Sequence, residues 1–125
     1  MENNSIEKNR DTGFLLYHEL YTLYLNLYPS LARFPKSEKF TLRHNIDQTA
    51  LEMLIILDKF TRLKQKDKTA KLRKIVYLFD KFKLLIRISK DLHFLPFNQY
   101  TLLVEKSELI GKLLGGLLKK YKTDL

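Results

Sequence analysis

The sequence contains no cysteine, and glycine and proline are scarce, with four and three residues among 125. Without cysteine there is no disulfide framework and no cysteine-based zinc site. Sandwiches and barrels of β-strands need frequent turn residues, so the scarcity of glycine and proline argues against them. The sequence is instead rich in Leu, Lys, Tyr and Phe, with 45% hydrophobic residues. This mix favours one helical domain with a buried core.

Long apolar runs are also missing. No run reaches the ~18 residues of a membrane span, and the polar start MENNSIEKNRDTG is unlike a signal peptide. We therefore expect a cytoplasmic protein with no membrane association. Residues 1–12 are expected to form a disordered polar tail, residues 13–121 the folded domain, and residues 122–125 a short C-terminal tail.

The residue patterns of enzymes are absent as well. The three histidines, His18, His44 and His93, are far apart and lack metal-ligand spacing. The segment GKLLGG does not match the phosphate-binding pattern G-x-x-x-x-G-K-[ST], and Asp47 and Glu52 do not share a helical face. We therefore expect no catalytic site, no metal, no cofactor and no small-molecule substrate.

Apolar spacing predicts four helices, over residues 13–31, from residue 38 or 41 to 64, and over residues 67–92 and 96–121. The connecting segments are short, so sequential helices are expected to be antiparallel neighbours. The predicted fold is all-α, an up-down-up-down four-helix bundle. In the first helix one leucine face is predicted to be core: Leu16, Leu20, Leu23, Leu27 and Leu31.

A second stripe of the first helix contains four tyrosines: Tyr17, Tyr21, Tyr24 and Tyr28. We interpret it as the margin of the core, with the hydroxyl groups reaching water. The alternative is that the rings stack on nucleobases.

The second and third helices carry an additional apolar stripe on the side opposite their core face. Exposing such stripes on a monomer is unfavourable, so they predict self-association. The alternative is that the stripe of the third helix contacts the fourth helix or the N-terminal tail. The candidate oligomer interface consists of Leu51, Ile55, Tyr77, Leu84 and Ile88.

Small residues recur in the fourth helix at Ser107, Gly111 and Gly115, which lie on one line. A glycine inside a helix costs roughly 1 kcal/mol relative to alanine. Close packing of another helix on this line would offset that cost. The alternative is an early end of the helix at Gly115 and Gly116.

Positive charge is concentrated in one part of the chain. The formal net charge is +9, yet residues 59–90 alone contain twelve basic and two acidic residues. A basic surface of this kind fits the phosphates of a nucleic acid, with affinity that falls steeply with salt. The alternative is a solvated lysine face with no partner.

Four segments occur in order on the successive predicted helices: FPKSEKFTL, LEMLI, LLIRISKDLHFLPFNQYTLL and IGKLLGGLLK. Together they resemble the Avd-type family, the accessory variability proteins of diversity-generating retroelements, over about residues 13–120. A related family, encoded in intervening sequences of 23S ribosomal RNA genes, typically has an NIAEG-like segment in its second helix. Here the corresponding region reads IDQTALEML, so the Avd-type family fits better.

The resemblance implies a four-helix bundle that assembles as a pentameric barrel, without a catalytic site. It further implies that the protein binds a reverse transcriptase and its template RNA and supports mutagenic cDNA synthesis. Arg87 matches a basic position of the family's third helix, and Lys36 and Lys39 match basic positions of its FPKS segment. Asn45 and Leu117 depart from the family, which often has Arg and Trp there.

Taken with the basic segment, the resemblance predicts which residues contact RNA phosphates or an acidic polymerase surface: Lys71, Arg73, Lys74, Lys81, Lys83, Arg87 and Lys90. The FPKS segment is also the predicted connection between the first two helices, anchored by Phe34 and Phe40. A different function remains open, namely a self-assembling structural bundle with no role in nucleic-acid binding.

Overall fold

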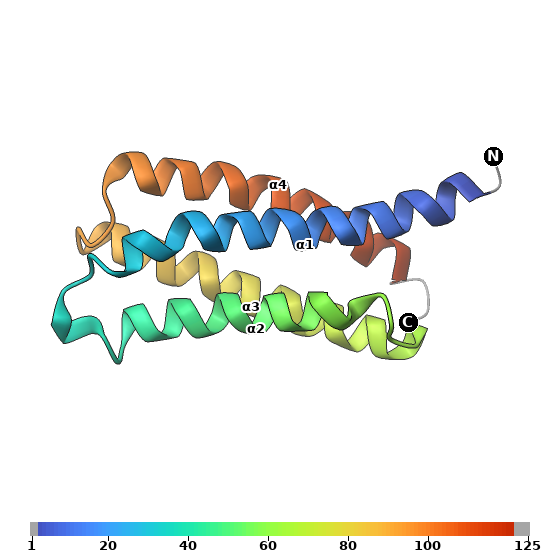
Figure 1. The fold of residues 1–125 in the computed structure, drawn as a ribbon, viewed down its shortest axis with the longest axis horizontal. Helices are drawn as coiled ribbons and strands as arrows, with labels where there is room; N and C mark the ends of the chain where they lie inside the picture. The colour runs from blue at the N-terminus through green and yellow to red at the C-terminus, as the bar shows by residue number, and fades with distance from the viewer. Residues whose placement is uncertain (1–2, 122–125) are drawn as a thin grey trace.

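The computed structural model describes the backbone of residues 3–121 and the side chains of residues 12–121. It contains four long helices: α1 (Asn3–Leu31), α2 (Leu42–Phe60), α3 (Gln65–Asp91) and α4 (Phe97–Tyr121). A 3₁₀ helix, η1 (Lys36–Glu38), lies between α1 and α2, and no strand occurs within residues 3–121. Successive helices run in opposite directions, and α1 begins at the end of the bundle where α4 finishes (Figure 1). The predicted all-α four-helix architecture is confirmed.

The helices are arranged as a square in cross-section. The principal contacts join α1 to α2, α2 to α3, α3 to α4, and α4 back to α1. Therefore α1 and α3 lie on one diagonal, and α2 and α4 lie on the other. The centre is filled by apolar side chains from all four helices, including the predicted leucine face of α1 and the fully buried Phe82.

Two helix boundaries differ from the sequence prediction. Helix α1 begins at Asn3, ten residues before Gly13, so the polar segment that was predicted to be disordered is helical from Asn3 on. Polarity alone did not reveal this, because a helix that is nucleated by the apolar residues after Gly13 can propagate into a polar segment. Helix α2 ends at Phe60, earlier than predicted. Residues 1–2 and the predicted tail at 122–125 lie outside the described residues.

The connections at one end of the bundle are held together by aromatic packing. Phe34, after α1, is buried, and its ring centroid lies 5.6 Å from that of Phe94, after α3. Phe40 was predicted to be a second anchor, but its side chain is 79% exposed, with Lys39 Nζ 5.5 Å from the ring centroid. Phe34 alone therefore anchors the FPKS segment. Its contact with Phe94 fixes the α1–α2 connection against the α3–α4 connection.

Candidate nucleic-acid interface

The seven cations predicted to bind RNA or polymerase all lie on α3, but the structure does not bring them into one cluster. Helical spacing places Lys71, Lys74 and Lys81 on the side of α3 that faces α2. Lys83, Arg87 and Lys90 lie on the side that faces α4. Arg73 lies next to the exposed apolar stripe that separates these two rows. The cations therefore form two rows, one on each side of the outer surface of α3.

The row on the α2 side is only partly neutralised. The ammonium nitrogen of Lys74 lies 3.8 Å from a carboxylate oxygen of Glu52 on α2, and both side chains are about half exposed. An ion pair with this exposure contributes little to stability. No ion pair is found within the described chain for Lys71 and Lys81, the other members of this row, or for Arg73 beside the apolar stripe. These three cations therefore remain available to an anionic partner.

The row on the α4 side contains one uncompensated cation. Lys83 lies 3.6 Å from Asp80 and its Nζ is 4.6 Å from the centroid of the Phe79 ring. Lys90 lies 3.3 Å from Asp91 and 5.2 Å from the ring of Tyr100. Arg87 forms no ion pair with any residue in the described range. It is also the α3 position that the family resemblance singled out.

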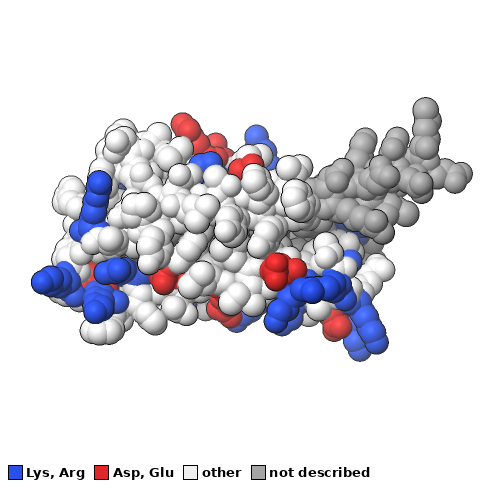
Figure 2. Space-filling model, in the orientation of Figure 1, with Lys and Arg blue, Asp and Glu red and all other residues white. Residues whose placement is uncertain are grey.

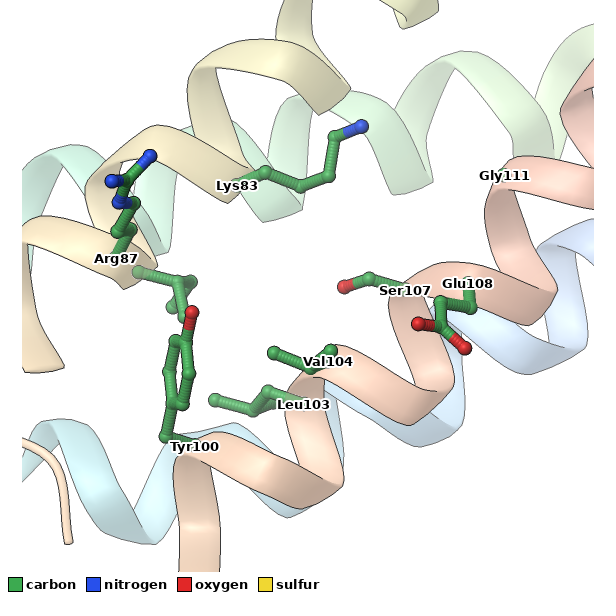
Figure 3. Close-up of a pocket in the computed structure, with 9 residues that line it drawn as sticks. Lys83, Arg87, Tyr100, Leu103, Val104, Ser107, Glu108 and Gly111 are labelled. Carbon is green, nitrogen blue, oxygen red and sulfur yellow. The ribbon is translucent and has the colours of Figure 1, made fainter. Parts of the chain in front are cut away.

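A pocket of about 350 Å³ opens beside this second row, between α3 and α4 (Figure 3). Its apolar lining comes from Ile86, Leu103 and Val104, and the Tyr100 ring lies at one end. The polar and small residues that complete it are Lys83, Arg87, Ser107, Glu108 and Gly111. The Ser107 side chain points from α4 into the open space, as Figure 3 shows. The pocket is not among the sites predicted from the sequence.

The small residues of α4 account for the pocket, which corrects an expectation. They were expected to receive a closely packed helix, yet a Cβ atom at Gly111 would meet only Phe79, at an ordinary 3.8 Å. A Cβ atom at Gly115 would meet nothing within 4 Å. The alternative of an early helix end is wrong too, because α4 continues to Tyr121. The small side chains therefore leave space between α3 and α4.

Further cations gather at the ends of the bundle. Figure 2 shows Lys and Arg at both ends of the face formed by α1 and α2, with few charges in the middle. At the η1 end, a pocket of about 210 Å³ is lined by Lys39, Phe40, Arg43, His44 and Asp47. Lys36 is exposed beside it. The family-matched Lys36 and Lys39 thus lie on the connection between α1 and α2, at the end of the bundle where α3 finishes.

The predicted oligomer interface is largely solvent-exposed in a single chain. Tyr77 is 61% and Leu84 57% exposed, and Ile55 and Ile88 are exposed as well, whereas Leu51 is half-buried. Within the described residues, Tyr77 and Leu84 of α3 are therefore not covered by α4. The α3 stripe therefore remains open for a partner.

A second exposed apolar stripe runs along α1 and was missed as an interface. It consists of Phe14, Tyr21, Leu25 and Tyr28, with Phe14 66% and Tyr28 58% exposed. Their spacing of seven, four and three residues keeps them on one helical face, which was the available signal. The prediction that the tyrosines form a core margin holds for the rings of Tyr17 and Tyr24, which are half-buried against the core, but the Tyr24 hydroxyl binds Asp47 on α2 instead of water. For Tyr21 and Tyr28 it is wrong.

Two kinds of site are absent from the described part of the chain. No group of three or more His, Cys, Asp or Glu side chains there is arranged to hold a metal ion. No described helix combines the length and apolar character needed to cross a membrane.

Comparison with known proteins gives one result that covers nearly the whole domain. No curated protein matches the chain. A family model described as bAvd-like matches residues 14–121, which include α2, α3, α4 and most of α1. This match confirms the resemblance deduced from the ordered segments. The chain therefore belongs to the bAvd-like family.

Proposed function

We propose that this protein is a non-catalytic accessory subunit of a diversity-generating retroelement. In this role it binds the element's reverse transcriptase and template RNA and supports mutagenic cDNA synthesis. Membership of the bAvd-like family supports the role. The observation that carries it is the set of exposed α3 cations, Lys71, Arg73 and Arg87, that have no ion-pair partner in the described chain.

Cations of this kind bind the phosphate backbone. Contacts to phosphates supply affinity and position the nucleic acid, but they read little sequence. Two rows on one helix, together with the basic ends of the bundle, suit a structured RNA that lies against α3. The same surface is suited to an acidic patch on the polymerase. In this proposal the reverse transcriptase carries out the catalysis, and this protein only binds.

Self-association completes the proposal. A ring needs two different complementary surfaces on each subunit, because each subunit contacts the next one head to tail. Among the described residues, exposed apolar side chains form one stripe on α1 and another on α3, and these helices occupy opposite corners of the bundle. Packing of the α1 stripe of one subunit on the α3 stripe of the next would bury both. The pentamer implied by family kinship is the proposed closed form.

The decisive experiment measures RNA binding as a function of salt. The test variant carries Lys71→Glu, Arg73→Glu and Arg87→Glu on α3. The matched control carries Lys106→Glu, Lys112→Glu and Lys119→Glu on α4, so both variants lose the same net charge. Affinity for a structured RNA is followed by fluorescence anisotropy, and helicity by circular dichroism. In a plot of the logarithm of the association constant against the logarithm of the salt concentration, each lost phosphate contact should reduce the steepness of the negative slope by about 0.7–0.9.

We expect the α3 variant to bind RNA more weakly and with a smaller dependence of affinity on salt. The α4 variant should keep most of the affinity and most of its salt dependence. The same pair of proteins, tested against the purified reverse transcriptase, separates an RNA surface from a polymerase surface. Equal losses in the two variants would show that only net charge matters. That result would contradict a binding role for α3.

A second candidate function is a self-assembling structural bundle without nucleic-acid binding. The two exposed apolar stripes favour it, because they support assembly whether or not RNA is present. Under this function the wild-type protein forms its oligomer but shows no salt-dependent affinity for RNA.

A further inference from the structure

The pocket between α3 and α4 is a gap between two packed helices. It exists because Ser107 and Gly111 are small and stand on the side of α4 that faces α3. Its volume of about 350 Å³ lies near the lower end of the ~300–1,000 Å³ typical of ligand pockets. The space therefore suits one small group.

The lining of the pocket is apolar below and polar around the opening. Val104 of α4, with the buried Leu103 next to it, supplies apolar lining, and Tyr100 closes one end (Figure 3). Ile86 contributes from α3, where it is part of the core. A nucleobase has two flat faces that gain from such contacts, and aromatic residues are the usual platforms for them.

The two edges of the opening have opposite charge. The α3 edge carries Arg87, which has no ion pair among the described residues, and Lys83, which is only partly engaged by Asp80. The α4 edge carries Glu108, for which no ion pair is found in the described chain either. The cationic edge suits a phosphate, and a carboxylate accepts hydrogen bonds but cannot donate them.

We infer that this pocket receives a single unpaired nucleotide of the bound RNA. The base lies between the two helices, its phosphate is held by Arg87 and Lys83, and its edge donates to Glu108. The inference rests on the proposed RNA-binding function and adds a specific site to it. An RNA chain is favoured over a free small molecule because the cations continue along α3 as far as Lys90.

The chemistry of Glu108 also implies a preference among the bases. Proteins read unpaired bases by hydrogen bonds to their Watson–Crick edges. Guanine presents two adjacent N–H donors on that edge, which a carboxylate accepts together. Uracil presents one such donor. Guanine is therefore the expected occupant.

The test uses the purified full chain and three RNA hairpins that differ only at one position. One hairpin is fully paired, one has a single bulged guanine, and one has a single bulged uracil. We expect the wild-type protein to bind the bulged-guanine hairpin about 10-fold more tightly than the paired hairpin, in line with the contribution of one stacked base.

Two glycine variants of α4 form the matched comparison. Gly111→Leu fills the pocket without changing charge. Gly115→Leu makes the same substitution one helical turn further along α4. Gly115 does not line the pocket, and nothing lies within 4 Å of a Cβ atom added there. Gly111→Leu should abolish the preference for a bulge while leaving affinity for the paired hairpin unchanged. Gly115→Leu should keep the preference.

A third variant keeps the inference testable even if Gly111→Leu disturbs the fold. Glu108→Gln is nearly isosteric and surface-located, and it should reduce the preference for bulged guanine over bulged uracil. Equal affinity of the wild type for all three hairpins, or a guanine preference that survives both substitutions, would overturn the inference but leave RNA binding intact. Failure of the wild type to bind any hairpin would overturn the proposed function as well.

Discussion

The hydroxyl group of Tyr24 on α1 donates a hydrogen bond of 2.6 Å to a carboxylate oxygen of Asp47 on α2. Burial of the phenol, together with the neighbouring carboxylate, raises the pKa of Tyr24 well above the ordinary tyrosine value of about 10. The phenol therefore stays neutral and keeps its proton for the hydrogen bond. This contact joins two helices at a point where most other contacts are apolar.

Replacing Tyr24 should weaken the bundle. Tyr24→Phe removes the hydroxyl and leaves the Asp47 carboxylate without this donor. We expect the free energy of unfolding to fall by about 1.5–3 kcal/mol, the usual contribution of a hydrogen bond to a charged group. Urea denaturation followed by circular dichroism measures this change. Tyr28→Phe is the matched control, since Tyr28 is exposed, and it should change stability little.

The same pair has a pH dependence of defined sign. Below about pH 10 the tyrosine is protonated in both the folded and the unfolded chain, so the stabilisation by the hydrogen bond is fully present. Above that pH the unfolded chain loses the Tyr24 proton first, because folding raises the pKa, and stability declines. The difference in free energy of unfolding between wild type and Tyr24→Phe should decrease as pH rises beyond about 10. An increase in this difference would contradict the raised pKa.

The glycines of α4 provide a prediction about packing. Gly115 lies inside the helix, and an added Cβ atom would meet nothing within 4 Å. Gly115→Ala should therefore raise the free energy of unfolding by up to about 1 kcal/mol, because alanine is the better helix former. Thermal unfolding measures it, with Gly116→Ala as a second open position. A lower melting temperature for Gly115→Ala would show that a helix of another subunit packs on this line.

The parts of the fold that the sequence predicted are those set by local periodicity. Leu16, Leu20 and Leu23 recur with the spacing of one helical face, and all three are buried. That spacing requires no knowledge of the other helices, because any core-facing helix needs such a stripe. The same reasoning located the exposed stripe of α3, since Tyr77 and Leu84 are seven residues apart on the side opposite the core.

The parts that were not predictable depend on how the helices are placed relative to one another. Ser107 and Gly111 could have formed a close helix contact or a pocket, and only the separation of α3 and α4 decides between them. Tyr24 and Tyr28 look equivalent in the sequence, yet only Tyr24 is turned toward α2. Phe40 was expected to be an anchor because it is aromatic, but its place between η1 and α2 leaves it in solvent.

The two exposed apolar stripes lead to a prediction about assembly that uses pairs of variants. One variant carries Tyr77→Ser and Leu84→Ser on α3, and the other carries Leu25→Ser and Tyr28→Ser on α1. All four side chains are exposed in the single chain, so the fold of each variant should be retained. If the α1 stripe of one subunit packs on the α3 stripe of the next, each variant alone should be monomeric.

Mixing the two variants distinguishes this contact from a symmetric one. In an equimolar mixture the intact α1 stripe of the first variant can still pack on the intact α3 stripe of the second. Because each partner then has only one usable face, growth stops at a heterodimer. Light scattering after size-exclusion chromatography should thus show monomers for each variant and dimers for the mixture. An unchanged oligomer for either variant, or a mixture that stays monomeric, would contradict the head-to-tail contact, since a contact between two copies of one stripe cannot be rescued by mixing.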